Sequence, residues 1–211
     1  GMTTVALGLE RAADKVGQET MGFFDQAKHW QYRVGVTQIL TPKWLASANL
    51  EAVSDSGYLG NPYRAARVFG AAVPENVPRT RSSRALNLRA IGDLGSPNAP
   101  RSAIRGSYRY FWDNWDVKSH TVEGGYSRYV GESFLLDGFV RHYRQSKASF
   151  YSDDAQVQNT YVTRNRQLGT YSGNTLGGKV TYSWRKVPGQ YEIKFNGALE
   201  LLRYRYSDYT D

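Results

Sequence analysis

The clearest pattern in the chain lies between Leu176 and Leu201, where two alternating runs flank the turn at 187–190. In both runs the apolar residues share one parity and the charged residues share the other. The apolar set is Leu176, Val180, Tyr182, Trp184, Tyr191, Ile193, Phe195, Leu199 and Leu201. A period of two predicts β-strands with two unlike faces. Because one face carries full charges and the other carries aromatic residues, the pattern favours strands with lipid outside and water or a polar plug inside.

The same alternation predicts six earlier strands. They cover about 29–40, 44–53, 83–92, 102–112, 117–129 and 134–146. The parity is less regular in the last of these, because Phe139 and Tyr143 share the charged face. Together the eight strands predict an all-β fold, an antiparallel up-and-down transmembrane β-barrel or part of a larger one.

The lengths of the connections support this fold independently. The two long connections, 54–82 and 147–174, are separated by an even number of strands, so they fall at the same end. The connections at the other end are shorter: 40–43, 93–101, 130–133 and 187–190. Short turns at one end and long loops at the other are typical of outer-membrane barrels.

The segment 1–28 is set apart from the barrel domain, 29–211, because its pattern fits two structures. Val5, Leu7 and Leu9 alternate as in a strand, but their continuation through Ala12, Ala13 and Val16 also fits an amphipathic helix. A strand here would make 11–28 a further long connection at the loop end. It would also make the strand count odd, and the chain ends without a terminal aromatic residue. We therefore expect that missing chain or a second copy closes the barrel.

Composition narrows the class of partner. The formal charge is +8, but Lys and Arg are spread over nearly every strand and alternate with Asp and Glu. That distribution is unlike a nucleic-acid footprint, so we expect no nucleic-acid partner. A basic rim against anionic membrane lipid or lipopolysaccharide fits this distribution of charge better, and a solvated surface is the plainer alternative.

The aromatic content is high. Sixteen Tyr and five Trp fit aromatic girdles at both membrane interfaces, or a tyrosine-rich soluble sandwich. There is no cysteine and no apolar run of the roughly 20 residues that a spanning helix needs.

The charged parity gives a set of candidate lumen-facing residues. They are Arg33, Glu51, Arg89, Arg105, Arg109, Glu123, Asp137, Arg141, Lys179, Arg185, Glu192, Lys194 and Glu200. They form either a lumen that selects solutes or holds a plug, or a network of compensating pairs. Eight strands leave room only for side chains, which favours the network. In the first long loop, Tyr58, Asn61, Tyr63 and Arg64 are candidate ligand contacts, or parts of a loop that only folds over the mouth.

Catalytic and metal sites are not expected. His120, Asp137, Arg141 and His142 suggest acid–base chemistry, but no serine lies in a G-x-S-x-G motif. The adjacent acids Asp153 and Asp154 lack the spaced ligands of a calcium site. We therefore predict a protein that is not an enzyme and uses no cofactor or metal.

Several motifs resemble a bacterial family of unknown function. They are Gly35-Val36-Thr37-Gln38-Ile39-Leu40-Thr41-Pro42, 56–64 (SGYLGNPYR), 108–115 (YRYFWDNW), Ser119-His120-Thr121 and 141–146 (RHYRQS). In this order they resemble domain-of-unknown-function family 3570 over 29–205. The resemblance implies an outer-membrane β-barrel and implies that this chain corresponds to the C-terminal half of longer members. It implies no activity and no substrate.

The predicted function is that of an outer-membrane protein, a passive channel or a structural component of the cell envelope. The alternative is a soluble or periplasmic β-barrel that binds an apolar ligand in its interior. The direction of the apolar parity separates the two. Tyr182, Trp184, Ile193 and Phe195 point outward in the membrane protein and inward in the soluble one.

Overall fold

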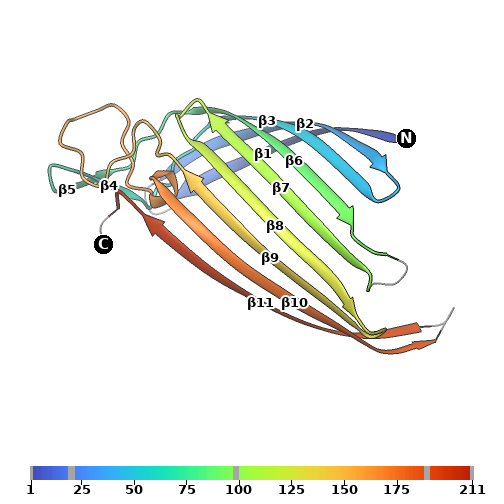
Figure 1. Ribbon diagram of the computed structural model, residues 1–211. Coiled ribbons are helices and arrows are strands. Elements are labelled where there is room, and N and C mark those ends of the chain that lie inside the picture. The colour runs from blue at the N-terminus through green and yellow to red at the C-terminus, as the bar shows by residue number, and fades with distance from the viewer. Residues whose placement is uncertain (1, 19–21, 97–99, 188–190, 210–211) are drawn as a thin grey trace.

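One large antiparallel sheet accounts for most of the chain (Figure 1). The computed structural model describes residues 2–18, 22–96, 100–187 and 191–209, without the side chains of 18 and 185–187. Nine strands form the sheet in the order β1-β2-β3-β6-β7-β8-β9-β10-β11. Their bounds are β1 Thr3–Gln18, β2 Phe23–Thr41, β3 Trp44–Gly57, β6 Thr80–Asp93, β7 Ser102–Asp113, β8 Lys118–Val130, β9 Phe134–Gln145, β10 Tyr171–Val187 and β11 Tyr191–Tyr206. The all-β antiparallel prediction is confirmed.

The sheet is open. Among the described strands, β1 and β11 each pair on one side only, so they form its two edges. The eight strands predicted from residue 29 onward are all present, and β1 adds a ninth. The predicted turn at 187–190 lies outside the described residues, apart from Val187 at the end of β10.

Residues 3–18 form a strand rather than a helix. β1 pairs with β2 along its whole length, from Thr3 opposite Gln38 to Gln18 opposite Phe23. The helical alternative was wrong because this continuous ladder satisfies the backbone groups that a helix would otherwise pair internally. The expected long connection at 11–28 was also wrong, since only residues 19–22 separate β1 from β2.

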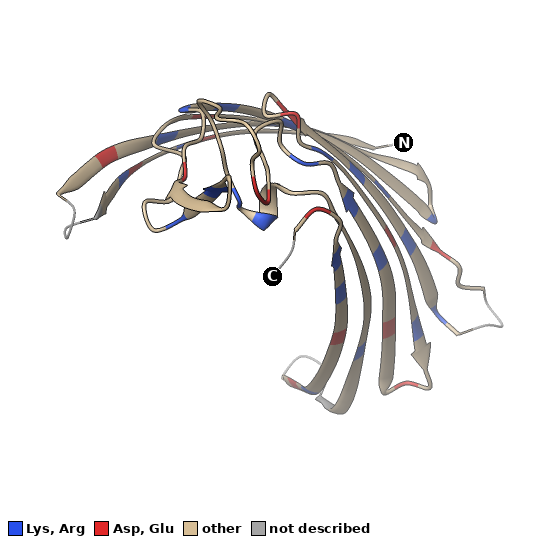
Figure 2. Ribbon diagram, turned by 90° about the vertical axis from the view of Figure 1, so that its left-hand side faces the viewer, with Lys and Arg blue, Asp and Glu red and all other residues tan. Residues whose placement is uncertain are grey.

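Both long connections lie at one end of the sheet and inside its curve (Figure 2). Residues 58–79 contain a separate hairpin, β4 Ala65–Val68 and β5 Ala71–Pro74. Residues 146–170 contain one short 3₁₀ turn, η2 Arg166–Leu168. The predicted loops 54–82 and 147–174 are therefore shorter by several residues. The strands extend into the predicted loops because their ends consist of small polar residues without an apolar alternation. Ser56, for example, still pairs with Thr80.

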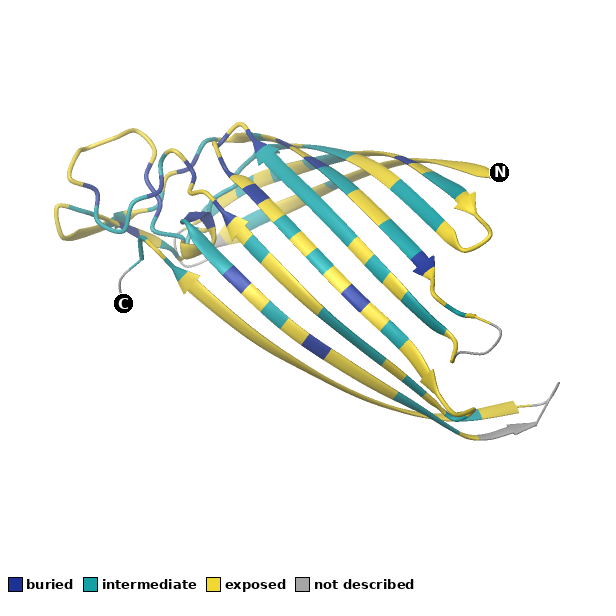
Figure 3. Cartoon of the chain, in the orientation of Figure 1, coloured by how far each residue is buried: buried dark blue, intermediate teal, exposed yellow. Residues whose placement is uncertain are grey.

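The sheet has two chemically different faces, defined by register. The concave face carries Asp55, Arg81, Arg109, Ser119 and Tyr143, which line a cavity with residues of the two long loops. Residues in the opposite register form the convex face. Along strands such as β8, burial alternates from one residue to the next (Figure 3).

The buried apolar core lies at the loop end rather than along the sheet. Its larger part, called here the loop core, comprises Val77, Trp115, Val117, Ala148, Tyr151 and Leu168. A smaller cluster of Ala66, Ala155 and Val162 joins the two long loops. The loops thus pack against each other and against the ends of the central strands.

No helix in the described part of the chain is long and apolar enough to cross a membrane.

Candidate functional site

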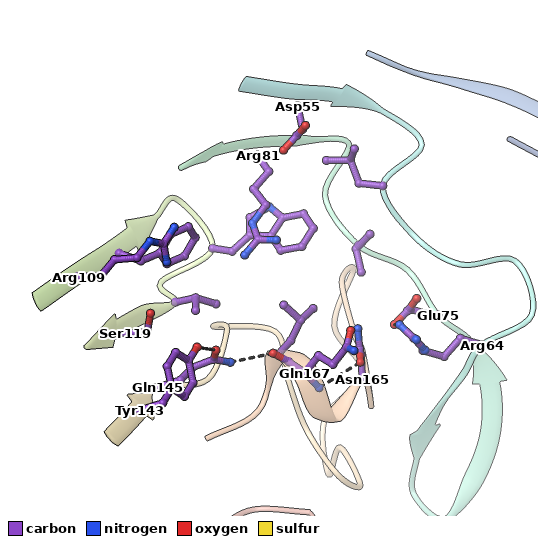
Figure 4. A pocket seen from close by; sticks show the side chains of 16 residues that line it. Asp55, Arg64, Glu75, Arg81, Arg109, Ser119, Tyr143, Gln145, Asn165 and Gln167 are labelled. Atoms are coloured by element: carbon purple, nitrogen blue, oxygen red, sulfur yellow. Dashed lines mark hydrogen bonds and ion pairs between the residues drawn. The ribbon is translucent and has the colours of Figure 1, made fainter. Parts of the chain in front are cut away.

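A polar cavity lies on the concave face beneath the two long loops (Figure 4). Its volume is about 480 Å³, and it is called here the vestibule. The sheet contributes Asp55 from β3, Arg81 from β6, Arg109 and Phe111 from β7, Ser119 from β8, and Tyr143 and Gln145 from β9. The loops contribute Arg64, Glu75, Asn165 and Gln167, together with apolar residues of the loop core. The vestibule therefore combines a rigid strand wall with a loop roof.

Asp113 and Arg81 fix the roof to the wall. The Asp113 carboxylate is fully buried and accepts hydrogen bonds from the backbone N–H groups of Trp115 and Val117, both at 2.9 Å. The Arg81 Nη2 atom lies 2.6 Å from Asp113 Oδ2, and its guanidinium stands 4.6 Å from the Trp115 ring centroid. A buried carboxylate with several charge-assisted donors is firmly held. These residues therefore stabilise the turn 114–117 that carries Trp115.

Gln145 ties the second long loop to β9. Its side-chain amide donates to the carbonyl oxygens of Gln167, at 2.8 Å, and Gly169, at 3.0 Å. The Tyr143 hydroxyl donates to Gln145 Oε1, and Asn165 Oδ1 accepts from the Gln167 backbone N–H at 3.1 Å (Figure 4). This network holds η2 in place as one side of the vestibule.

Glu75 joins the two loops to each other. Its side chain is only 2% exposed, and it accepts hydrogen bonds from the Thr163 hydroxyl and from the Asn61 backbone N–H at 3.2 Å. Arg64 is 3.9 Å from it, which is a long ion pair. Nearby, the backbones of Asn76 and Val162 exchange hydrogen bonds of 3.1 and 2.8 Å. The roof is therefore one connected structure.

Arg109 is the vestibule cation with the most freedom to meet a solute. Among the described residues it forms no ion pair with a carboxylate, and its guanidinium stands 5.5 Å from the Phe111 ring. Arg81 is paired to Asp113, and Asp55 to His29 at 2.6 Å. The cavity thus presents one uncompensated guanidinium among hydroxyl and amide groups, which suits a polar or anionic solute.

The predicted lumen-facing residues share the concave register wherever their side chains are described. These are Arg33, Glu51, Arg89, Arg105, Arg109, Glu123, Asp137, Arg141, Lys179, Glu192, Lys194 and Glu200. The Arg185 side chain lies outside the described residues.

Many of these charges form ion pairs with one another. Arg105 reaches across β8 to Asp137 with bonds of 2.6 and 2.9 Å, passing over Gly125, which has no side chain to block it. Arg141 lies 2.6 Å from Glu123. Further pairs join Arg33 to Glu51 at 3.4 Å and Lys194 to Glu192 at 2.9 Å. In contrast, Arg89, Arg109 and Lys179 have no ion pair to any described carboxylate.

Of the four predicted loop contacts, only Arg64 lines the vestibule. Tyr58 packs on Phe23 with ring centroids 4.8 Å apart, and Asn61 accepts a 2.9 Å hydrogen bond from the Tyr63 backbone N–H. Tyr63 is 73% exposed. Tyr58 and Asn61 therefore shape the loop.

The residues considered for acid–base chemistry are not brought together. Asp137 and Arg141 lie in the concave register, whereas His120 and His142 lie in the convex register. Conversely, none of Trp115, Arg81, Glu75 and Gln145 was among the predicted site residues. The sequence offered one indication of this site, the tryptophan in the tight turn Asp113-Asn114-Trp115-Asp116. Turns usually expose their side chains, so a large apolar residue there suggests that other residues pack on it.

Burial of Tyr151 predicts a pH-dependent loop end. Desolvation, followed by the charges of Asp208 and Asp153, raises the pKa of Tyr151 from its ordinary 10.0 to about 12. A group whose pKa is raised on folding stabilises the folded state below its unfolded pKa and loses that contribution as pH rises to the folded value. We therefore expect the loop end to lose stability between pH 10 and 12, measured by urea unfolding followed by tryptophan fluorescence. Tyr151→Phe should weaken this dependence, and equal dependence in both chains would contradict the assignment.

Comparison with known proteins places the chain in one family. No curated protein matches the sequence, and no solved structure matches it either. A family model described as "Protein of unknown function (DUF3570)" matches residues 7–199. The match extends the resemblance carried by the motifs between residues 35 and 146 back into β1. The chain therefore belongs to the family DUF3570 of proteins of unknown function.

Proposed function

We propose that this sheet forms the wall of a β-barrel in a Gram-negative outer membrane, with the convex face against lipid and the concave face lining an aqueous lumen. The protein then serves as a passive channel or as a structural component of the envelope. The long loops fold into the mouth and form the vestibule, which polar solutes pass.

The observation that carries the proposal is the inverted distribution of polarity between the two faces. Convex residues such as Leu199 and Phe195 are 68% and 58% exposed, although they are apolar. Every Asp and Glu in the described strands of the large sheet lies in the concave register: Glu10, Asp14, Asp25, Glu51, Asp55, Asp93, Asp113, Glu123, Asp137, Glu192 and Glu200. A sheet that met water on its convex face would expose carboxylates there as well as basic residues, whereas a sheet in lipid exposes mainly apolar residues.

Aromatic residues on the convex face gather toward the two ends of the sheet. Toward the loop end lie Trp30, Tyr32, Tyr110 and Trp112; toward the other end lie Trp44, Phe134, Tyr182, Trp184, Tyr191 and Phe195. Aliphatic residues such as Val36, Leu88, Val140 and Leu176 occupy the levels between them. Two aromatic belts flanking an aliphatic band are the arrangement of outer-membrane barrels.

The soluble alternative requires an apolar concave face to hold its ligand. The concave face instead carries the ion pairs of Arg105 with Asp137 and of Arg141 with Glu123. Tyr182 and Phe195 share the convex register, and Trp184 is 60% exposed. The register thus favours the membrane protein.

Heat-dependent mobility in SDS gel electrophoresis tests the proposal. The chain is refolded in detergent and run with and without boiling. We expect the unboiled sample to migrate faster, because a closed barrel resists SDS and stays compact until it is heated. A chain that dissolves in plain buffer and shows no shift would contradict the proposal. Aggregation without a shift would mean that these strands do not close into a barrel by themselves.

A further inference from the structure

A strip of basic residues crosses the convex face next to the loop end. Lys118 and His120 lie on β8, His142 and Arg144 on β9, and Arg203 and Arg205 on β11. All six are exposed. They are called here the basic strip.

None of the carboxylates that the structure describes forms an ion pair with this strip. The described acidic residues of the sheet are on the concave face, and none of Lys118, Arg144, Arg203 and Arg205 forms an ion pair with a described carboxylate. The two histidines bind neutral partners, His120 the Tyr108 hydroxyl at 2.7 Å and His142 the Asn174 Oδ1 at 2.8 Å. The strip therefore concentrates positive charge at one level of a mainly apolar surface, and such charge attracts an anionic partner.

The spacing of the strip suits a phosphate. Arg144 pairs with Ser172, which pairs with Arg205, and His142 pairs with Asn174, which pairs with Arg203. Since neighbouring strands lie about 4.8 Å apart, each pair of flanking side chains is about 10 Å apart at the backbone. Ser172 and Asn174 supply hydrogen-bonding groups between them. A phosphate lying over β10 would therefore meet an arginine from β11 and a basic side chain from β9.

An apolar groove begins directly below the strip. A hollow of about 580 Å³ is lined by Val122, Gly124, Val140, Leu176 and Leu201, with Arg203 at its edge. A second hollow of about 660 Å³ shares Gly124, Val140 and Leu176 with the first, so the two are continuous.

Two convex glycines line this groove. Gly124 lines both hollows and Gly138 lines the second, and their neighbours across the ladder, Gly106 and Gly178, are glycines too. A Cβ at Gly124 would meet no atom within 4 Å, so the space is open toward the outside. The groove is thus a channel left by missing side chains on a surface that otherwise carries branched ones.

We propose that the basic strip and the groove form one binding site for a phosphorylated lipid, with phosphate against Arg144, Arg203 and Arg205 and an acyl chain in the glycine groove. The occupant is a lipid of the leaflet on the loop side, with the chemistry of a diphosphorylated, acylated glycolipid. The site rests on the proposed function, because it requires the convex face to meet lipid. It adds a selective lipid contact to a face that is otherwise mainly apolar.

Lipid binding by the refolded chain in a neutral detergent tests the site. Native mass spectrometry measures the affinity for diphosphoryl lipid A, with dioleoylphosphatidylcholine as the neutral lipid. We expect Arg144→Gln with Arg203→Gln to weaken lipid A binding about 30-fold, since each basic residue near an anionic lipid contributes about fivefold. Gly124→Leu should weaken it about tenfold, by displacing about two CH₂ groups of the chain. Inorganic phosphate alone should not displace the lipid.

The matched control removes the same charge from the other end of the sheet. Arg128 is exposed in the convex register of β8, and Lys43 lies in the turn between β2 and β3. Arg128→Gln with Lys43→Gln should change lipid A affinity less than about threefold, because these residues lie beyond a Debye length of about 8 Å from the basic strip. All variants are first compared for heat-dependent mobility in SDS, which reports folding.

Two failures are distinguishable. If the folded chain binds lipid A equally well after Arg144→Gln with Arg203→Gln, or if phosphate alone displaces the lipid, the site is wrong and the barrel proposal stands. If the chain is soluble without detergent and binds no lipid, the proposed function falls and the site with it. If Gly124→Leu does not fold, the exposed charge variants decide the question.

Discussion

Replacing Trp115 by alanine is expected to lower the free energy of unfolding of the loop end by about 3–5 kcal/mol, the range for a buried tryptophan. Trp115 is only 4% exposed, donates its ring N–H to the Thr80 carbonyl at 3.0 Å, and packs edge-on against Phe150 at 5.0 Å. Its loss also removes the ring beneath the Arg81 guanidinium. Limited proteolysis of residues 146–170, with urea unfolding of the same sample, measures the effect.

Trp184→Ala is the control for this experiment. Trp184 is 60% exposed and lies far from the loop core, so its loss should leave protease resistance of the loops unchanged. If Trp115→Ala leaves the loops as resistant as those of the unchanged chain, the loop core does not hold the roof of the vestibule.

Val180→Arg is expected to cost about 2–4 kcal/mol of folding free energy in a bilayer, the range for arginine on the lipid face near the midplane. Val180 is 44% exposed, lies near the middle of β10, and pairs with Leu136 and Gly197 in the convex register. The guanidinium would have to leave water for hydrocarbon. Urea titration of the chain folded into phosphatidylcholine vesicles measures the change.

The adjacent residue provides a control on the opposite face. Thr181 lies in the concave register, where its hydroxyl donates to Asn196 Oδ1 at 2.8 Å. Thr181→Arg keeps its charge toward the aqueous side, so it should cost less than about 1 kcal/mol, as for most substitutions of residues that face water. Equal costs at 180 and 181 would contradict the assignment of the convex face to lipid.

The alternation of residues was sufficient to predict eight strands of the large sheet and which of their residues share a face. In strands such as β10, where Val180 and Tyr182 alternate with Lys179 and Thr181, a period of two leaves one choice of register. The N-terminal strand was harder. Small residues such as Ala12 and Ala13 give no clear apolar period. Only the backbone pairing of this segment with β2 shows that it is a strand and not a helix.

The irregular parity of β9 has a local explanation. Phe139 lies on the concave face because Gly177 on the neighbouring strand leaves space that its ring covers. Tyr143 packs against Tyr171 at 5.2 Å near the vestibule. Both positions depend on a residue more than 25 positions away, which no local period reports.

The vestibule was less predictable than the wall. The first long loop was identified as a candidate contact region, but the roles of Glu75 and Gln145 arise from contacts between loops distant in sequence. Glu75 meets Thr163, and Gln145 meets Gln167 and Gly169. Such contacts depend on how two loops cross, and residue periodicity carries no information about this.

The two edges of the open sheet impose a rule on its closure. Nine strands alternate in direction, so β1 and β11 run the same way, from the short-turn end to the loop end. These edges meet each other only as a parallel pair, and the same holds for the edges of two copies that stand side by side with the same orientation. A ring made only of antiparallel ladders therefore takes up an odd number of strands from outside this sheet. The direction in which the two edge strands run therefore decides which partners can complete the barrel.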